Sequence, residues 1–322
     1  MILRRLPGTD LDLSTVGFGC WAAGKTWWGD DVDDELSVDA MHAALDQGIN
    51  WFDTAPLYGH GHADEVLARA LIGRRDRVII ATKVGVRWDA EGHHPESVLT
   101  DQSLRDDLES SLRRLRTDHI DLLQVHWPCQ HGTPLAQTLT TLHALRDEGK
   151  VRWLGLCNYN AVGLGAAALA GEVHSLQTPY SLLRREFESE LRPVTATRGP
   201  GGGPLGVLAY EPLCRGLLTG KYGPRQRFAD SDLRARDDRF QGDRYLRALT
   251  IVSRLSLLAR RIHVPVAALA LAWALRQPGI SAVIAGAKRA GQVAENARAM
   301  ALAEDEAQPW AEVDRIVAAH RG

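Results

Sequence analysis

Two hydrophobic patterns alternate along this chain. Short runs rich in apolar residues, such as 78–84 and 120–126, are separated by longer segments in which apolar positions recur every three to four residues. The first pattern is typical of buried strands and the second of amphipathic helices. The clearest helix is predicted over 101–115, where Leu104, Leu108, Leu112 and Leu115 share one face.

The alternation predicts eight strands in series. They span 16–20, 50–53, 78–84, 120–126, 151–156, 173–177, 206–210 and 280–285. Helices are predicted near 35–47, 64–72, 101–115, 135–148, 160–170, 186–197, 244–262, 266–276 and 291–300. A β-hairpin precedes them, because apolar residues at 3–6 and 11–13 flank the turn sequence Pro7-Gly8-Thr9-Asp10.

Eight strand–helix units predict an α/β fold whose parallel sheet closes into a (β/α)8 TIM barrel. An open, doubly wound sheet is the alternative, but it would normally carry Gly-x-Gly-x-x-Gly after its first strand. Here residues 17–22 read GFGCWA, which lacks the third glycine. The sequence therefore favours the barrel, with residues 1–322 forming a single domain.

Three predicted connections are longer than a simple turn requires, namely 85–99, 127–134 and 211–243. By the order of the strands, all three leave the carboxyl end of the barrel, where barrel enzymes keep their active sites. The segment 211–243 interleaves arginines with aspartates. Such a stretch is either a mobile lid or a solvated loop, and the sequence leaves both interpretations open.

Composition excludes several classes of function. The chain has 38 Lys and Arg against 40 Asp and Glu, so it offers no basic surface for nucleic acid. Its four cysteines form no Cys-x-x-Cys pair, and the pairs His60/His62 and His93/His94 lack nearby ligands, so no metal site is expected. With no secretory signal and no apolar run that could span a bilayer, we expect a cytoplasmic protein without a membrane partner.

Four residues carry candidate chemistry. Asp53, Lys83 and His126 stand at the carboxyl ends of successive predicted strands, and Tyr58 follows Asp53 within one loop. A buried acid, lysine and histidine each cost free energy unless they are paired. Strand-end charges that converge on one phenol indicate a tuned proton donor, and hence an enzyme.

At these positions the sequence resembles the aldo-keto reductases, and most closely their bacterial, general-stress-type branch. The resemblance runs almost end to end, through residues 48–59, 81–83, 118–128, 157–159, 177, 209–213, 216–221 and 292–296. It implies NADPH-dependent reduction of an aldehyde or ketone, with Tyr58 as proton donor. Lys83 would lower the pKa of Tyr58, Asp53 would hold the Lys83 ammonium, and His126 would orient the substrate oxygen.

The resemblance also implies a cofactor site. Asn158 and Gln177 would hold the nicotinamide carboxamide, Tyr210 would stack on its ring, and the segment 211–220 would lie along the pyrophosphate. Lys288 and Arg289 would receive the adenosine 2′-phosphate, which favours NADPH over NADH. The full set of candidate cofactor residues is Asn158, Gln177, Tyr210, Pro212, Leu213, Gly216, Leu218, Gly220, Gly286, Lys288, Arg289, Gln292, Glu295 and Asn296.

Two residues depart from the family pattern. Cys157 stands where the family usually has Ser, and a thiol is a poorer hydrogen-bond donor than a hydroxyl. Glu211 stands where Ser is usual, and its carboxylate would repel the pyrophosphate unless it turns away.

The expected partner is a small carbonyl compound. Trp21, Trp88 and Trp127 are the candidate substrate contacts, because an aromatic cleft suits an aryl, polyketide or sugar carbonyl. Two other functions stay open. The chain could be a cofactor-binding regulatory subunit with little turnover, or a lyase that uses Lys83 to form a Schiff base. The sequence leaves the oligomeric state open.

Overall fold

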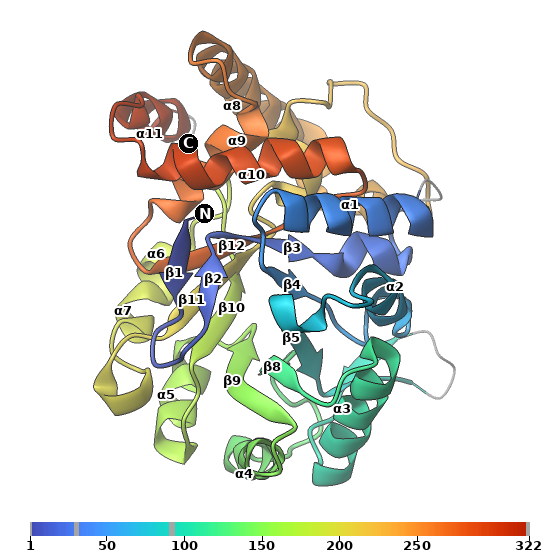
Figure 1. The fold of residues 1–322 in the computed structure, drawn as a ribbon. Coiled ribbons are helices and arrows are strands. Elements are labelled where there is room, and N and C mark those ends of the chain that lie inside the picture. Colours follow the sequence, from blue (N-terminus) through green and yellow to red (C-terminus); the bar gives the residue numbers. More distant parts are fainter. Residues whose placement is uncertain (1, 29–31, 90–93, 320–322) are drawn as a thin grey trace.

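Eight parallel strands close into a barrel at the centre of the computed structural model, which describes residues 2–28, 32–89 and 94–319 (Figure 1). In the order in which they pair, the strands are β3 (Val16–Gly19), β4 (Trp51–Asp53), β5 (Ile79–Val84), β8 (Ile120–Val125), β9 (Val151–Cys157), β10 (Ser175–Pro179), β11 (Gly206–Tyr210) and β12 (Ile280–Gly286). The barrel closes where β12 pairs with β3, with Ala285 opposite Phe18. The predicted TIM barrel is confirmed.

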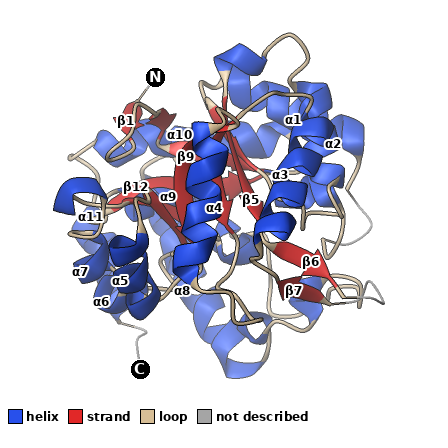
Figure 2. Ribbon diagram, turned by 90° about the horizontal axis from the view of Figure 1, so that it is seen from below, coloured by secondary structure: helices blue, strands red, loops and turns tan. Residues whose placement is uncertain are grey.

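Helices surround this barrel (Figure 2). They are α1 (Asp34–Asp46), α2 (His62–Ala70), α3 (Asp101–Leu115), α4 (Leu135–Asp147), α5 (Ala161–Ala170), α6 (Phe187–Glu190), α7 (Arg192–Thr195), α8 (Gly242–Arg261), α9 (Val266–Leu275), α10 (Ala290–Glu304) and α11 (Trp310–Ala318). In α3, Leu104 and Leu108 are fully buried, as the spacing of its leucines predicts. The main hydrophobic core lies between such helix faces and the strands.

The N-terminal hairpin packs against the amino end of the barrel interior. Its strands β1 (Leu3–Arg5) and β2 (Asp12–Ser14) pair antiparallel, as predicted. The leucines at 6, 11 and 13 join a buried cluster with Trp51, whose indole N–H donates to the Ser14 carbonyl at 2.8 Å. Gly17 makes room for this ring, because a Cβ there would lie 2.1 Å from Trp51. The hairpin thus covers the amino end of the barrel, whereas the candidate catalytic residues stand at the carboxyl ends of their strands.

The sequence-based prediction is wrong over 186–197, where one helix was expected. Two short helices, α6 and α7, replace it. Pro193 has no N–H to donate to the preceding turn, so the first helix ends and the second starts around it. The strand pair β6 (Val86–Trp88) and β7 (Pro95–Ser97) and the last helix, α11, were not predicted either.

Among the described residues, no single helix is both long and apolar enough to cross a membrane. In the same part of the chain, α8 and α9 taken together reach that length and composition, with a bend of 97° between them.

Candidate active site

The four candidate catalytic residues converge at the carboxyl end of the barrel. Asp53 ends β4, Lys83 lies near the end of β5, and His126 directly follows β8. The Lys83 Nζ donates to Asp53 Oδ1 at 2.6 Å, to the Thr54 carbonyl at 3.0 Å and to the Tyr58 hydroxyl at 3.2 Å. The rings of Tyr58 and His126 meet edge to face, with centroids 6.2 Å apart. One ammonium group thus joins the acid to the phenol.

Close backbone packing fixes the loop that carries Tyr58. A Cβ on Gly24 would lie 2.6 Å from the Tyr58 carbonyl carbon, and a Cβ on Gly59 would lie 2.2 Å from the Gly24 oxygen. Gly59 also has a φ of +65°, which glycine adopts without strain. The turn at Cys20–Gly24 that follows β3 can therefore lie directly against this loop. This contact brings Trp21 over Tyr58, with centroids 6.1 Å apart.

Burial and charge set the protonation states of the site. Burial alone would lower the pKa of Lys83, but the neighbouring Asp53 carboxylate outweighs it and raises that pKa. Burial raises the pKa of Tyr58, and the attraction of Lys83 offsets only part of this rise. The expected net lowering of the Tyr58 pKa is therefore wrong, although Lys83 acts in the expected direction. Tyr58 is a protonated phenol at neutral pH.

His126 is a neutral imidazole. Burial, and then the positive charge of Lys83, hold its pKa well below the ordinary value for histidine. A neutral ring has one N–H donor and one acceptor, so His126 can donate a hydrogen bond without adding a charge.

Hydrogen bonds connect the candidate nicotinamide residues to the catalytic group. The Tyr210 hydroxyl donates to Asn158 Oδ1 at 2.8 Å, and Asn158 Nδ2 donates to the His126 carbonyl at 3.0 Å and to Cys157 Sγ at 3.2 Å. The Cys157 thiol points to Gln177 Oε1 at 3.7 Å, and burial raises its pKa to about 12, which keeps it a thiol. Cys157 thus lies between the two amides.

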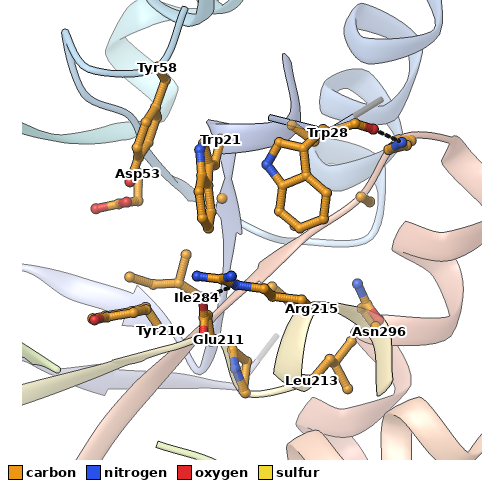
Figure 3. Close-up of a pocket in the computed structure, with 18 of the residues that line it drawn as sticks. Trp21, Trp28, Asp53, Tyr58, Tyr210, Glu211, Leu213, Arg215, Ile284 and Asn296 are labelled. Carbon is orange, nitrogen blue, oxygen red and sulfur yellow. Dashed lines mark hydrogen bonds and ion pairs between the residues drawn. The ribbon is translucent and has the colours of Figure 1, made fainter. Parts of the chain in front are cut away.

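A cavity of about 660 Å³ opens beside these residues. It is lined by the catalytic candidates Asp53, Tyr58 and His126, by Trp21 and Trp127, and by most of the candidate cofactor residues, namely Asn158, Gln177, Tyr210, Pro212, Leu213, Gly216, Gly286, Lys288, Gln292, Glu295 and Asn296. Figure 3 shows Trp21 and Trp28 along one wall, facing Arg215, Tyr210 and Glu211. The structure therefore brings together residues from most of the chain.

Several predicted residues lie outside the lining of this cavity. Lys83 is fully buried and contacts the Tyr58 hydroxyl, and Leu218 is buried in the hydrophobic core. Gly220 ends the turn after β11, where its φ is +75°, and Arg289 is exposed at the start of α10. Trp88 packs against a neighbouring loop instead, where its ring stacks on His60 with centroids 4.0 Å apart.

The Glu211 carboxylate is neutralised by arginines. It accepts hydrogen bonds from Arg215 and Arg239, both at 2.6 Å, and lies 4.0 Å from Arg184. Burial would raise the pKa of Glu211, but these cations lower it. Arg215 and Arg239 also bind Asp237, so the cluster joins the end of β11 to the long connection after it. The repulsion expected of Glu211 is thus offset within the protein.

The far end of the cavity carries two further cations, Lys288 and Arg234. The Lys288 Nζ donates to the Trp28 carbonyl at 2.9 Å, and the Arg234 guanidinium lies 5.3 Å from the centroid of the Trp28 ring. Arg234 is buried and forms a bidentate ion pair with Asp232. The connection over 211–243 is therefore anchored both to the loop after β3 and to the end of β11.

The sequence-based choice of residues missed several that line the cavity, namely Arg184, Lys221 and Arg234. A partial indication was present, because arginine and aspartate alternate over 230–239 at a spacing that suits local ion pairs. The sequence could not indicate which of these arginines points inward.

Among the described residues, no group of three or more His, Cys, Asp or Glu side chains could hold a metal ion. His93, one of the histidines considered above, lies outside the described residues.

The chain is similar to known proteins in both sequence and fold. A model of the aldo/keto reductase family matches residues 15–318. The chain is 32% identical, over 92% of its length and 94% of the relative's, to the NADH-specific methylglyoxal reductase of Escherichia coli. The solved glycerol dehydrogenase AKR11B4 from Gluconobacter oxydans matches with a TM-score of 0.87 and 35% identity, covering 99% of this chain and 96% of that one.

An aldo-keto reductase from Klebsiella pneumoniae, solved in complex with NADPH, also matches. Its TM-score is 0.74 at 27% identity, covering 98% of this chain and 96% of that one.

Proposed function

The chain belongs to the aldo/keto reductase family, and we propose that it reduces an aldehyde or ketone to an alcohol with NADPH, using Tyr58 as the general acid. One observation carries this proposal: the Lys83 ammonium contacts both Asp53 and the Tyr58 hydroxyl at the edge of a cavity. A phenol held beside a fixed positive charge can give up its proton to a developing alkoxide.

The protein groups would act in a simple order. Bound NADPH supplies a hydride to the carbonyl carbon. The N–H of neutral His126 would hold the carbonyl oxygen, and Tyr58 would give that oxygen its proton as negative charge builds up. Lys83 would stabilise the phenolate that remains, and Asp53 would keep the ammonium group in place. Since Tyr58 is protonated at neutral pH, the acid is ready before each turnover.

The residues present fit a phosphorylated dinucleotide. The amides of Asn158 and Gln177 offer both donors and acceptors to a carboxamide. At the other end of the cavity, α10 begins without a side-chain cap, beside Lys288. A helix amino terminus next to a lysine favours a phosphate group. These features, together with the NADPH bound by the Klebsiella relative, support NADPH as the cofactor.

The substrate we propose is an uncharged carbonyl compound. Tyr58 and His126 are flanked by Trp21, by Trp127 and by Leu57, all of which line the cavity. Aromatic and apolar walls favour a neutral ligand over an anion. The names of two relatives, a methylglyoxal reductase and a glycerol dehydrogenase, support a small oxygenated compound.

The compartment we propose is the cytoplasm.

The test begins with the cofactor. The purified protein is titrated with NADPH and with NADH while its tryptophan fluorescence is followed, and a panel of uncharged aldehydes and ketones is then offered under saturating NADPH. We expect tighter binding of NADPH and turnover of some members of the panel. Tight binding without turnover of any carbonyl would favour the regulatory subunit. The absence of binding by either cofactor would overturn the proposal.

A further inference from the structure

A second glutamine, Gln124, lies beneath the catalytic group and has no role in the chemistry described above. It is fully buried in β8, opposite Lys83 on one neighbouring strand and Gly155 on the other. Gly155 leaves room for it, because a Cβ there would lie 3.1 Å from the Gln124 Cγ. A buried amide costs free energy unless its polar atoms are satisfied, so its partners are informative.

Those partners are Asp53 and Gln177. The Gln124 Nε2 lies 3.5 Å from Asp53 Oδ2, a long contact, and its Oε1 accepts from Gln177 Nε2 at 3.3 Å. Gln177 Nε2 also donates to Asp53 Oδ2 at 2.7 Å. The other carboxylate oxygen of Asp53 faces Lys83. Two amides therefore hold the oxygen of Asp53 that Lys83 does not.

This triangle fixes the orientation of both amides. An ionised carboxylate can only accept hydrogen bonds, so each glutamine must turn its NH₂ group toward Asp53. The second N–H of Gln177 then needs an acceptor, which Gln124 Oε1 provides. As a result, the Gln177 oxygen faces Cys157 and the NH₂ group faces away from it. Without Gln124, the Gln177 amide would lose one of the contacts that set this orientation.

We propose that Gln124 is a positioning residue for the carbonyl reduction. Its amide holds the Asp53 carboxylate in place and sets the orientation of Gln177. It touches neither substrate nor cofactor, and it acts through these two neighbours. The inference rests on the proposed function, since it assigns Gln124 a part in the same site. Through Asp53, Gln124 keeps Lys83 in contact with Tyr58. Through Gln177, it determines that the side-chain oxygen of Gln177, and not its NH₂ group, is turned toward the cofactor.

The test uses two substitutions of similar size. Gln124→Leu removes both hydrogen bonds, and we expect kcat to fall by about 10- to 100-fold, as for small displacements of reacting groups. The solvent deuterium isotope effect on kcat should rise, because proton donation by Tyr58 becomes limiting. In Gln124→Glu, the neighbouring Asp53 should keep the new carboxyl protonated at low pH. Protonated, it can donate to Asp53 and accept from Gln177 as the amide does.

The pH dependence of Gln124→Glu separates positioning from mere packing. We expect the ratio of its kcat to that of the wild type to be near one at about pH 6 and to fall as the pH rises and the new carboxyl ionises. A ratio independent of pH, or a Gln124→Leu variant with wild-type kcat, would overturn the inference. Because Gln124→Glu differs from the wild type by one polar group, it keeps the inference testable if Gln124→Leu fails to fold.

The control is Thr141→Val, which removes a hydrogen bond from a buried residue of α4 far from the catalytic group. Its kcat should stay unchanged, and a loss equal to that of Gln124→Leu would mean that any buried polar deletion impairs the enzyme, which also overturns the inference. The wild type serves as the other reference. If the wild type neither binds NADPH nor reduces any carbonyl, the proposed function fails. If the wild type is active and the Gln124 variants have the same kcat, only this inference is overturned.

Discussion

The Lys83 ammonium nitrogen lies 2.6 Å from a carboxylate oxygen of Asp53, and both side chains are buried. Removal of one partner leaves an uncompensated charge in the barrel. We expect Lys83→Met to lower the free energy of unfolding by about 3–5 kcal/mol and to abolish carbonyl reduction. Urea unfolding and steady-state kinetics on the same preparation measure both effects.

The double variant Asp53→Asn with Lys83→Met removes both charges. Its stability should return most of the way to that of the wild type, while its activity stays lost, because the phenol no longer has a cation beside it. If the double variant is as unstable as Lys83→Met, the instability comes from lost packing and not from an unpaired charge.

Replacing Tyr58 by Phe should remove the proton donor and little else. Loss of a positioned general acid costs about 10²- to 10⁴-fold in kcat/KM, while NADPH binding should survive. Tyr180→Phe is the matched control, because Tyr180 is buried, donates to Glu188 and lies outside the cavity lining. Stopped-flow reduction of an active carbonyl measures both variants. Wild-type rates in Tyr58→Phe would contradict the assignment of the acid.

Lys288 and Arg289 should differ in their effect on cofactor choice. Lys288 lines the cavity, whereas Arg289 is exposed outside it. A charge-assisted hydrogen bond to phosphate contributes about 1.5–3 kcal/mol, so Lys288→Ala should weaken NADPH binding by roughly 10- to 100-fold and leave NADH nearly unchanged. Fluorescence titration of the two single variants and the double variant measures this. Equal losses for both cofactors would mean that the 2′-phosphate binds elsewhere.

The sequence predicted the barrel well because its strands are short segments rich in apolar residues and its helices carry a regular apolar face. It also predicted that Asp53, Lys83 and His126 would meet, since parallel strand ends converge at one end of a barrel. It failed where a local exception decided the structure, as at Pro193, which divides one predicted helix into α6 and α7.

The parts of the site that sequence reasoning missed depend on tertiary contacts. Glu211 pairs with Arg215, four residues away, and with Arg239, 28 residues away, and only the folded connection brings Arg239 to it. The pKa of Tyr58 was misjudged for a related reason. The attraction of Lys83 is visible in the sequence, whereas the burial that outweighs it is not.

Asp107 should make stability depend on pH. Burial raises the pKa of its carboxyl to about 6, although the Gly85 N–H donates to it at 2.8 Å. The folded state thus keeps a proton between about pH 4 and 6 that the unfolded chain has lost, so this residue's contribution falls as the pH rises through that window. Because protonation of Asp107 is linked to folding, the free energy of unfolding should fall by up to about 3 kcal/mol across this window.

The variant Asp107→Asn cannot ionise, yet its amide oxygen can still accept from Gly85. The difference in free energy of unfolding between the variant and the wild type should therefore grow in the variant's favour from pH 4.5 to 7. Urea unfolding of both proteins across this range isolates Asp107, since the buried histidines contribute equally to each. A difference that does not change with pH would contradict the raised pKa.

Gly24 should be needed for activity as well as stability, because its missing side chain lets the Tyr58 loop approach. In Gly24→Ala the new methyl group would meet the Tyr58 carbonyl carbon at 2.6 Å, so the loop must move and carry the phenol away from Lys83. Overpacking of this kind costs about 1–3 kcal/mol, and a shift near 1 Å costs up to ~100-fold in kcat.

Gly165→Ala in α5 is the control, since nothing lies within 4 Å of its Cβ position. It should stabilise the helix by about 0.5–1 kcal/mol without changing kcat. Thermal unfolding and kinetics of the two variants measure these effects, and a fully active Gly24→Ala would mean that the loop tolerates displacement without losing the contact between Tyr58 and Lys83.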